Sequence, residues 1–202
     1  SAVLDMLAKA AGCGVTDLLG GRVRSELEMY VASGNRQTTP EEEVDFLQQY
    51  VDRTGAKAVK FKLGGRMSRN ADSLAGRTEG LLRLARKHFG DDFIIHADGN
   101  GSFDAKKGIE IGRIVESVGT YFYEEPCPFD DLWDTKEVAD ALDVPLAFGE
   151  QETSLRRFAW LIENNAAQVI QPDLQYTGGF IQCMKAARMA ERAGMAVTPH
   201  VS

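Results

Sequence analysis

Residues 93–98 read Phe-Ile-Ile-His-Ala-Asp, a short apolar and β-prone run that ends in a carboxylate. The pattern returns as Tyr-Phe-Tyr-Glu at residues 121–124 and as Pro-Leu-Ala-Phe-Gly-Glu at residues 145–150. Two later apolar runs also stand just before a polar residue, Asp173 in one case and His200 in the other. Because aromatic and β-branched residues favour strands, these polar residues mark the ends of successive strands.

The residues that close these runs recur at intervals of 26, 26, 23 and 27 positions: Asp98, Glu124, Glu150, Asp173 and His200. Each interval matches one strand plus one returning helix. Such repeats favour a parallel sheet closed into a barrel, in which catalytic groups come from the carboxyl ends of several strands and point into one mouth.

The predicted fold class is therefore α/β, a TIM-type (β/α) barrel. Seven strands are expected, at residues 27–32, 56–63, 93–98, 121–124, 145–149, 168–172 and 195–199. Helices are expected between them, including residues 132–142, 154–163 and 179–193. A complete barrel takes about 250 residues, so this chain of 202 residues is expected to be truncated before its eighth strand.

Residues 1–202 are expected to form one domain, because no linker or low-complexity tract divides the repeats. Within it, residues 1–26 are predicted to be a helix, over Ala2–Leu19, followed by a linker. The connection Gly64–Gly76 is polar and longer than the usual ~2 to 6 residues of a βα loop, so it is expected to act as a lid.

The composition excludes several classes of partner. The formal net charge is −7 and lysine and arginine do not cluster, so neither nucleic acid nor an anionic membrane is expected as a partner. No apolar run approaches the ~20 residues that span a bilayer. The three cysteines lie far apart without CxxC spacing, which fits a reducing compartment. We expect a cytoplasmic homo-oligomer that acts on a small molecule.

Three carboxylates at the ends of successive strands suit Mg²⁺, a hard cation that prefers oxygen ligands and keeps open positions for water or substrate. Each acid alone would more often be a solvated strand end. The even spacing of Asp98, Glu124 and Glu150 favours a shared metal site. Glu124 is chosen over Glu125, because adjacent residues of a strand point to opposite sides.

Two lysines, Lys60 and Lys62, share one face of the second strand. An isolated pair of this kind is usually solvated, but the apolar neighbours of these lysines indicate that the other face is buried. Two inward ammonium groups disfavour each other's protonation, so a lysine here can act as a base near neutral pH. Asp173 and His200 end neighbouring strands, where the carboxylate can orient the imidazole.

His88 and His96 are interpreted as structural residues. His88 lies on the apolar stripe of a helix, and His96 lies two residues deeper in its strand than Asp98.

The combination of motifs resembles the enolase superfamily, and within it the mandelate racemase-like subgroup. The motifs are Lys60-Phe61-Lys62, Asp98-Gly99-Asn100, Glu124-Glu125-Pro126, Gly149-Glu150, Pro172-Asp173 with Gly178-Gly179, and Pro199-His200. They span nearly the whole chain. The N-terminal capping domain of this family and the eighth strand are expected to be absent.

The resemblance implies a role for each residue of the site. Asp98, Glu124 and Glu150 would be the Mg²⁺ ligands. Lys62 would be one general base, and His200 with Asp173 the other, on the opposite face of the substrate. Lys60 would lie near the substrate carboxylate. A histidine and aspartate pair, in place of a lysine after the sixth strand, points away from the muconate-lactonising subgroup.

The predicted activity is Mg²⁺-dependent abstraction of the proton α to a carboxylate, followed by dehydration of a sugar acid such as an aldonate or aldarate. Candidate substrate contacts are Arg66, Asn70, Asn100 and Tyr176. Three alternatives remain open. The same site can racemise or epimerise a 2-hydroxy acid, Lys60 or Lys62 can form a Schiff base as in aldolases, or the barrel can be a binding module without catalysis.

Overall fold

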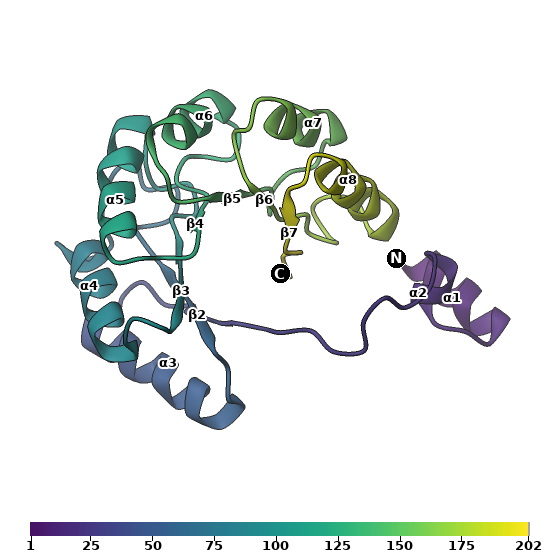
Figure 1. The fold of residues 1–202 in the computed structure, drawn as a ribbon, viewed down its shortest axis with the longest axis horizontal. Helices are drawn as coiled ribbons and strands as arrows, with labels where there is room; N and C mark the ends of the chain where they lie inside the picture. The colour runs from purple at the N-terminus through teal and green to yellow at the C-terminus, as the bar shows by residue number, and fades with distance from the viewer. Residues whose placement is uncertain (202) are drawn as a thin grey trace.

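The computed structural model describes residues 1–201, and these residues form one seven-stranded parallel sheet. The strands follow one another across the sheet in chain order, which Figure 1 shows for β2 to β7. They are β1 Val31–Ala32, β2 Ala58–Lys62, β3 Ile94–Asp98, β4 Tyr123–Glu124, β5 Leu146–Phe148, β6 Val169–Ile170 and β7 Ala196–Val197. All seven strands predicted from the sequence are present.

The strand register brings the charged ends together. Lys62 lies beside Asp98 in the pairing of β2 with β3, and Asp98 lies beside Glu124 in the pairing of β3 with β4. An isolated bridge joins Asp173 to His200 beyond the ends of β6 and β7. The carboxyl ends of all the strands therefore meet along one rim.

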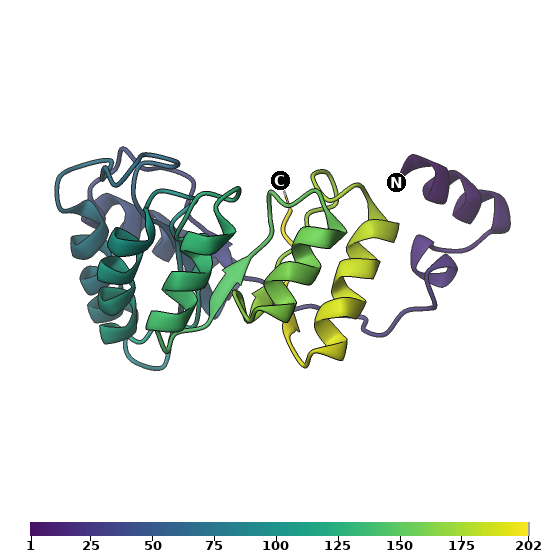
Figure 2. The same cartoon turned by 90° about the horizontal axis from the view of Figure 1, so that it is seen from above.

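Six helices alternate with the strands and cover the outer, convex side of the sheet (Figures 1 and 2). They are α3 Pro40–Thr54, α4 Arg77–Phe89, α5 Ala105–Ser117, α6 Leu132–Ala141, α7 Leu155–Glu163 and α8 Phe180–Arg192. None of the helices of residues 1–201 is both long and apolar enough to cross a bilayer.

Local sequence signals set the helix ends. The Thr39 side chain accepts a hydrogen bond from the Glu42 backbone N–H, Glu42 returns the contact, and Pro40 opens the first turn of α3. Gly55 ends α3 in the left-handed region at φ 69°. Asp104 caps α5 by accepting from the Lys107 N–H.

The sheet is curled but not closed. Within residues 1–201, β1 pairs only with β2 and β7 pairs only with β6. Apolar side chains between sheet and helices form the core, with Phe61 and Leu81 on one side of the arc and Phe148 and Phe158 on the other. The fold is therefore a seven-stranded partial barrel, as the spacing predicted.

The N-terminal segment differs from the prediction. The single helix expected over Ala2–Leu19 is two helices, α1 Ala2–Ala11 and α2 Val15–Leu18, because Gly12 adopts a left-handed φ of 68° and ends α1. The first strand is shorter than predicted. Only Val31 and Ala32 pair with β2, while residues 27–30 form an extended segment without ladder hydrogen bonds.

The loop between β2 and α4 is fastened to the loop that follows β3. The backbone N–H of Met67 donates to Asn100 O at 3.0 Å, and that of Asn70 donates to Ser102 O at 2.8 Å. The Asn70 amide also pairs with Asp104, through its Nδ2 at 2.7 Å and its Oδ1 at 2.9 Å. These bonds make the loop a fixed rim of the site, which argues against the independent lid expected from its length.

Candidate active site

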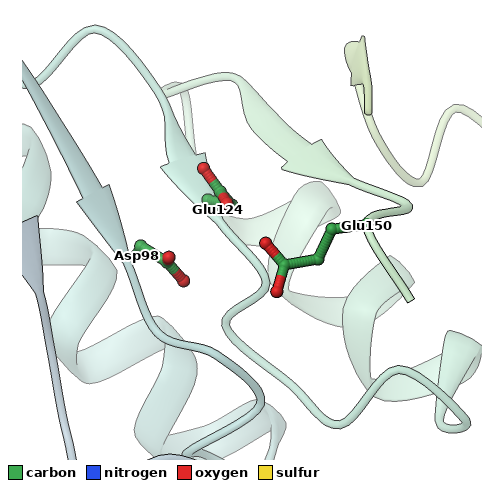
Figure 3. Close-up of side chains that lie close together, drawn as sticks. All are labelled: Asp98, Glu124 and Glu150. Atoms are coloured by element: carbon green, nitrogen blue, oxygen red, sulfur yellow. The ribbon is translucent and has the colours of Figure 1, made fainter. Parts of the chain in front are cut away.

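Three carboxylates lie together at the carboxyl ends of three neighbouring strands. Asp98 ends β3, Glu124 ends β4, and Glu150 follows β5 two residues after its last residue. One oxygen atom of each lies within 4.8 Å of the others, and the three groups face one another in Figure 3. All three side chains are buried.

The charges of Asp98, Glu124 and Glu150, the acid trio, favour a bound cation. Burial, together with the neighbouring charge of Asp98, raises the pKa of Glu124 to about 8. Burial also acts to raise the pKa of Asp98, but Lys60 and Lys62 outweigh it and hold that pKa below its usual value. Glu150 Oε2 is buried without a hydrogen-bond donor in good geometry. Crowded, buried and partly unpartnered oxygens of this kind fit a divalent ion.

The two lysines contact these acids directly. Lys60 Nζ lies 2.5 Å from Glu124 Oε1 and 3.4 Å from Asp98 Oδ2, and Lys62 Nζ lies 2.6 Å from Asp98 Oδ2. Burial lowers the pKa of Lys60, but Asp98 and Glu124 more than compensate, so its pKa lies above the usual value. The sequence predicted that the two lysines lower each other's pKa. At Lys60 the neighbouring carboxylates outweigh this effect, so Lys60 is held as a cation.

The imidazole lies at the other end of the row of acids. His200 Nδ1 is 2.8 Å from Asp173 Oδ2, and His200 Nε2 is 3.3 Å from Glu150 Oε2. Asp173 Oδ1 accepts from the backbone N–H groups of Gln175 at 2.6 Å and Tyr176 at 2.9 Å. Burial raises the pKa of Asp173, but these N–H groups and His200 hold it below its usual value. A fixed carboxylate thus orients the ring.

Asn100 links the two ends of the site. Its Oδ1 accepts from Lys62 Nζ at 2.9 Å, and its Nδ2 donates to Glu150 Oε1 at 3.1 Å. Its backbone N–H donates to Asp98 Oδ1 at 2.8 Å. The predicted substrate contact therefore lies inside the cluster.

The other predicted substrate contacts lie further out. Both ends of the Asn70 amide are occupied by Asp104. The Tyr176 side chain is exposed, and this residue reaches the site through its backbone N–H to Asp173. Arg66 is exposed on the fixed loop, where its backbone N–H donates to Ser102 Oγ.

The histidines interpreted as structural lie outside the cluster. His96 stacks on Phe122 with ring centroids 3.9 Å apart, and burial, with the nearby charge of Lys60, lowers its pKa to about 4. His88 Nε2 lies 2.9 Å from Gln48 Oε1 on the helical side.

Sequence reasoning missed Gln171 and Arg36, and it set Glu125 aside in favour of Glu124. Gln171 Nε2 donates to Glu124 Oε2 at 3.2 Å. Gln171 stands two residues before Asp173, so strand alternation was a signal that could have found it. Glu125 is buried beside the trio in a left-handed conformation (φ 36°), and its carboxylate accepts from Gln151 Nε2 at 3.0 Å. Arg36, from the loop after β1, donates from Nη2 to Asn100 Oδ1.

A row of three acids thus lies between a lysine and an aspartate-oriented histidine, on the carboxyl rim of a (β/α) barrel. The profile of the family described as enolase C-terminal domain-like matches residues 42–202. The chain belongs to this family, so the resemblance predicted from the motifs is confirmed.

Several relatives in sequence are named as sugar-acid dehydratases. The chain is 32% identical to L-talarate/galactarate dehydratase of Salmonella typhimurium over 98% of its own length and 48% of that protein. It is 30% identical to arabinonate dehydratase of Saccharolobus solfataricus, over 100% of its own length and 52% of the relative. The chain therefore spans about half the length of these relatives.

Solved structures share the fold. A mandelate racemase/muconate lactonizing protein from Paracoccus denitrificans, complexed with magnesium, has a TM-score of 0.90 and 29% identity, over 98% of this chain and 52% of that one. L-talarate dehydratase from Polaromonas sp. JS666, complexed with Mg and L-glucarate, has a TM-score of 0.84 and 28% identity, over 98% and 54%. Magnesium is thus the metal bound by structural relatives.

Proposed function

We propose that the protein catalyses Mg²⁺-dependent dehydration of a sugar acid, beginning with removal of the proton α to its carboxylate. The observation that supports this most directly is the order of groups along the rim. Lys62 contacts Asp98 at one end of the acid row and His200 contacts Glu150 at the other. Two proton carriers therefore flank a single metal-binding cluster.

Asp98, Glu124 and Glu150 would hold the metal. Bound there, Mg²⁺ would supply positive charge that stabilises the negative charge gained by the substrate carboxylate as the α proton leaves. Lys60 adds a second, permanent cation beside Glu124. A carbon acid next to a carboxylate is too weak for a side-chain base without such stabilisation.

The two flanking groups divide the proton transfers. One of them, Lys62 Nζ or His200 Nε2, accepts the α proton. The other donates a proton to the departing β-hydroxyl, which leaves as water. The resulting enol takes up a proton at carbon 3 and becomes a 2-keto-3-deoxy acid. Asp173 keeps the Nδ1 proton of His200 in place, so that Nε2 faces the substrate.

The alternative on the same site is racemisation or epimerisation, in which the second group returns a proton to the α carbon instead of releasing water. Racemase-type proteins also occur among the structural relatives. The dehydratase names among the sequence relatives favour water loss.

The test is a screen of the full-length protein with Mg²⁺ against acid sugars, in D₂O, with detection of 2-keto-3-deoxy products and of α-deuterium. Lys62→Met and His200→Asn should each lower turnover by about 10² to 10⁴-fold, the usual contribution of a general acid or base. Lys107→Met, in an exposed pair with Glu110, is the matched control and should leave turnover unchanged. Deuterium exchange or inversion without any keto-deoxy product would contradict dehydration.

Two further expectations belong to the proposal, namely a cytoplasmic location and self-association. The three cysteines are free thiols in the structure, which supports a reducing compartment. Light scattering of the full-length protein tests the homo-oligomer, and a monomer at micromolar concentration would contradict it.

A further inference from the structure

Arg36 is a cation of the site that the proposed mechanism does not use. It lies in the loop between β1 and α3 and is only partly exposed. Its Nη2 donates to Asn100 Oδ1, the same oxygen atom that accepts from Lys62 Nζ. The guanidinium therefore lies inside the mouth, one amide away from both Lys62 and Glu150.

The charge of Arg36 is balanced only at longer range, by Asp98 and Glu150. Lys60, Lys62 and Arg77 each lie within 4.0 Å of a carboxylate oxygen. Within residues 1–201, Arg36 has no such partner. Its hydrogen bonds go to two neutral oxygens, Asn100 Oδ1 and, at 3.5 Å, Leu63 O. A partly buried guanidinium with donors to spare favours an anionic ligand, and its planar fork matches a carboxylate.

The surroundings strengthen this preference. Burial lowers the pKa of Arg36. The negative charges of Asp98 and Glu150 act to raise this pKa, and the positive charges of Arg66 and Arg77 act to lower it further. Arg66 is held near Arg36 by the fixed loop, whose Met67 N–H donates to Asn100 O. Positive charge thus accumulates on the Lys62 side of the mouth, away from His200.

We propose that Arg36 binds a second carboxylate of the substrate, at the end remote from the metal, so that dicarboxylic sugar acids are preferred over monocarboxylic ones. This inference rests on the sugar-acid dehydration proposed above and names its substrate class. The sequence relatives include dehydratases named for both kinds of acid, talarate/galactarate and arabinonate or galactonate, so similarity alone leaves the choice open.

The first test compares sugar acids of one stereochemical series that differ only in the terminal group, such as galactarate and galactonate. The full-length wild type with Mg²⁺ should have the higher kcat/KM for the diacid. Arg36→Met should lower that value about 10- to 100-fold, the range for loss of a charge-assisted contact, mainly through KM. Its kcat/KM for the monoacid should change by less than about threefold, and Arg36→Lys should lie between the two.

Arg83→Met is the matched control, because Arg83 forms an exposed pair with Glu79 on α4. It should leave both substrates unchanged. If Arg36 only positions Asn100, Arg36→Met will slow the diacid and the monoacid by the same factor, and the proposal is then wrong. A wild type that prefers the monoacid overturns it as well.

A binding measurement separates this proposal from the dehydration itself. Adipate and hexanoate have six carbons and no hydroxyl to lose, and they differ only in the second carboxylate. By calorimetry with Mg²⁺, the wild type should bind adipate at least about tenfold more tightly than hexanoate, and Arg36→Met should remove that advantage. Equal affinities in the wild type would refute the role of Arg36 even if dehydration is found. Failure of all acid sugars with the adipate preference intact would refute only the dehydration.

Discussion

Replacing Asp173 with asparagine should leave the fold intact and invert the proton arrangement of His200. Asp173 Oδ1 accepts two backbone N–H groups, from Gln175 at 2.6 Å and Tyr176 at 2.9 Å. An asparagine must keep its carbonyl oxygen on these two donors. Its NH₂ group then faces His200 Nδ1, now 2.8 Å from the Asp173 carboxylate. The imidazole must accept at Nδ1, which places its proton on Nε2, the nitrogen that should take up a proton.

The size of the effect follows from the alternative. If the amide of the new asparagine turns over, its NH₂ faces two backbone donors, and each buried unsatisfied donor costs about 1 to 3 kcal/mol. The productive tautomer is thus disfavoured by about 2 to 6 kcal/mol, and activity should fall by a factor between about 30 and about 2 × 10⁴.

The assay is steady-state turnover of the full-length Asp173→Asn variant with Mg²⁺, beside its thermal unfolding midpoint and Mg²⁺ affinity. Both of the latter should stay close to wild type, because Asp173 does not contact the three acids directly. Asp131→Asn, the same change at the N-cap of α6, is the control. Retention of more than one tenth of wild-type turnover by a folded Asp173→Asn variant would falsify the orienting role.

Four further predictions concern the acid cluster and the fixed loop. Burial and Asp98 raise the pKa of Glu124 to about 8, so below that pH Mg²⁺ must displace a proton from Glu124. The Mg²⁺ dissociation constant, measured by calorimetry, should therefore rise by about tenfold per pH unit from pH 8 to pH 6. A dissociation constant that does not change with pH would contradict this. The folded state without metal holds that proton more tightly than the unfolded chain, so its stability should fall as pH rises from about 4.5 to about 8, as denaturant titrations will show. Lys60→Met leaves Asp98 and Glu124 without their buried cation and should lower the free energy of unfolding by about 3 kcal/mol. Added Mg²⁺ should then raise the free energy of unfolding of the variant more than that of the wild type. An equal increase in both proteins would argue against the ion pairs of Lys60 with these two acids. Asn70→Ala should release the loop from Asp104, lower the free energy of unfolding by about 1 kcal/mol and speed tryptic cleavage after Arg66. An unchanged cleavage rate would show that other contacts hold the loop.

The predictable part of this molecule is the part governed by strand periodicity. Parallel strands place their carboxyl ends on one rim, so residues that close successive strands meet regardless of what the helices between them do. That is why Asp98, Glu124 and Glu150 could be brought together from spacing alone. The pairing of Asp173 with His200 followed from the same rule, since β6 and β7 are neighbours.

The unpredicted part depends on backbone conformation between the strands. Arg36 reaches Asn100 only because of the path of the loop after β1, and strand or helix periodicity does not describe such a path. Glu125 is buried because its φ of 36° turns the chain just after β4. The break at Gly12 had a visible signal, a glycine that suits a helix C-cap, but the apolar pattern on both sides favoured one helix.

The two open edges of the curled sheet, at β1 and β7, affect how the protein behaves in solution. The outer edges of β1 and β7 have no strand partner within residues 1–201, and a cavity of about 790 Å³ is lined by residues that include Tyr30, His96 and Phe122. Such edges template the addition of another strand. A polypeptide of these 202 residues should therefore self-associate at high concentration. An increase of its particle size with concentration would indicate strand pairing at these edges.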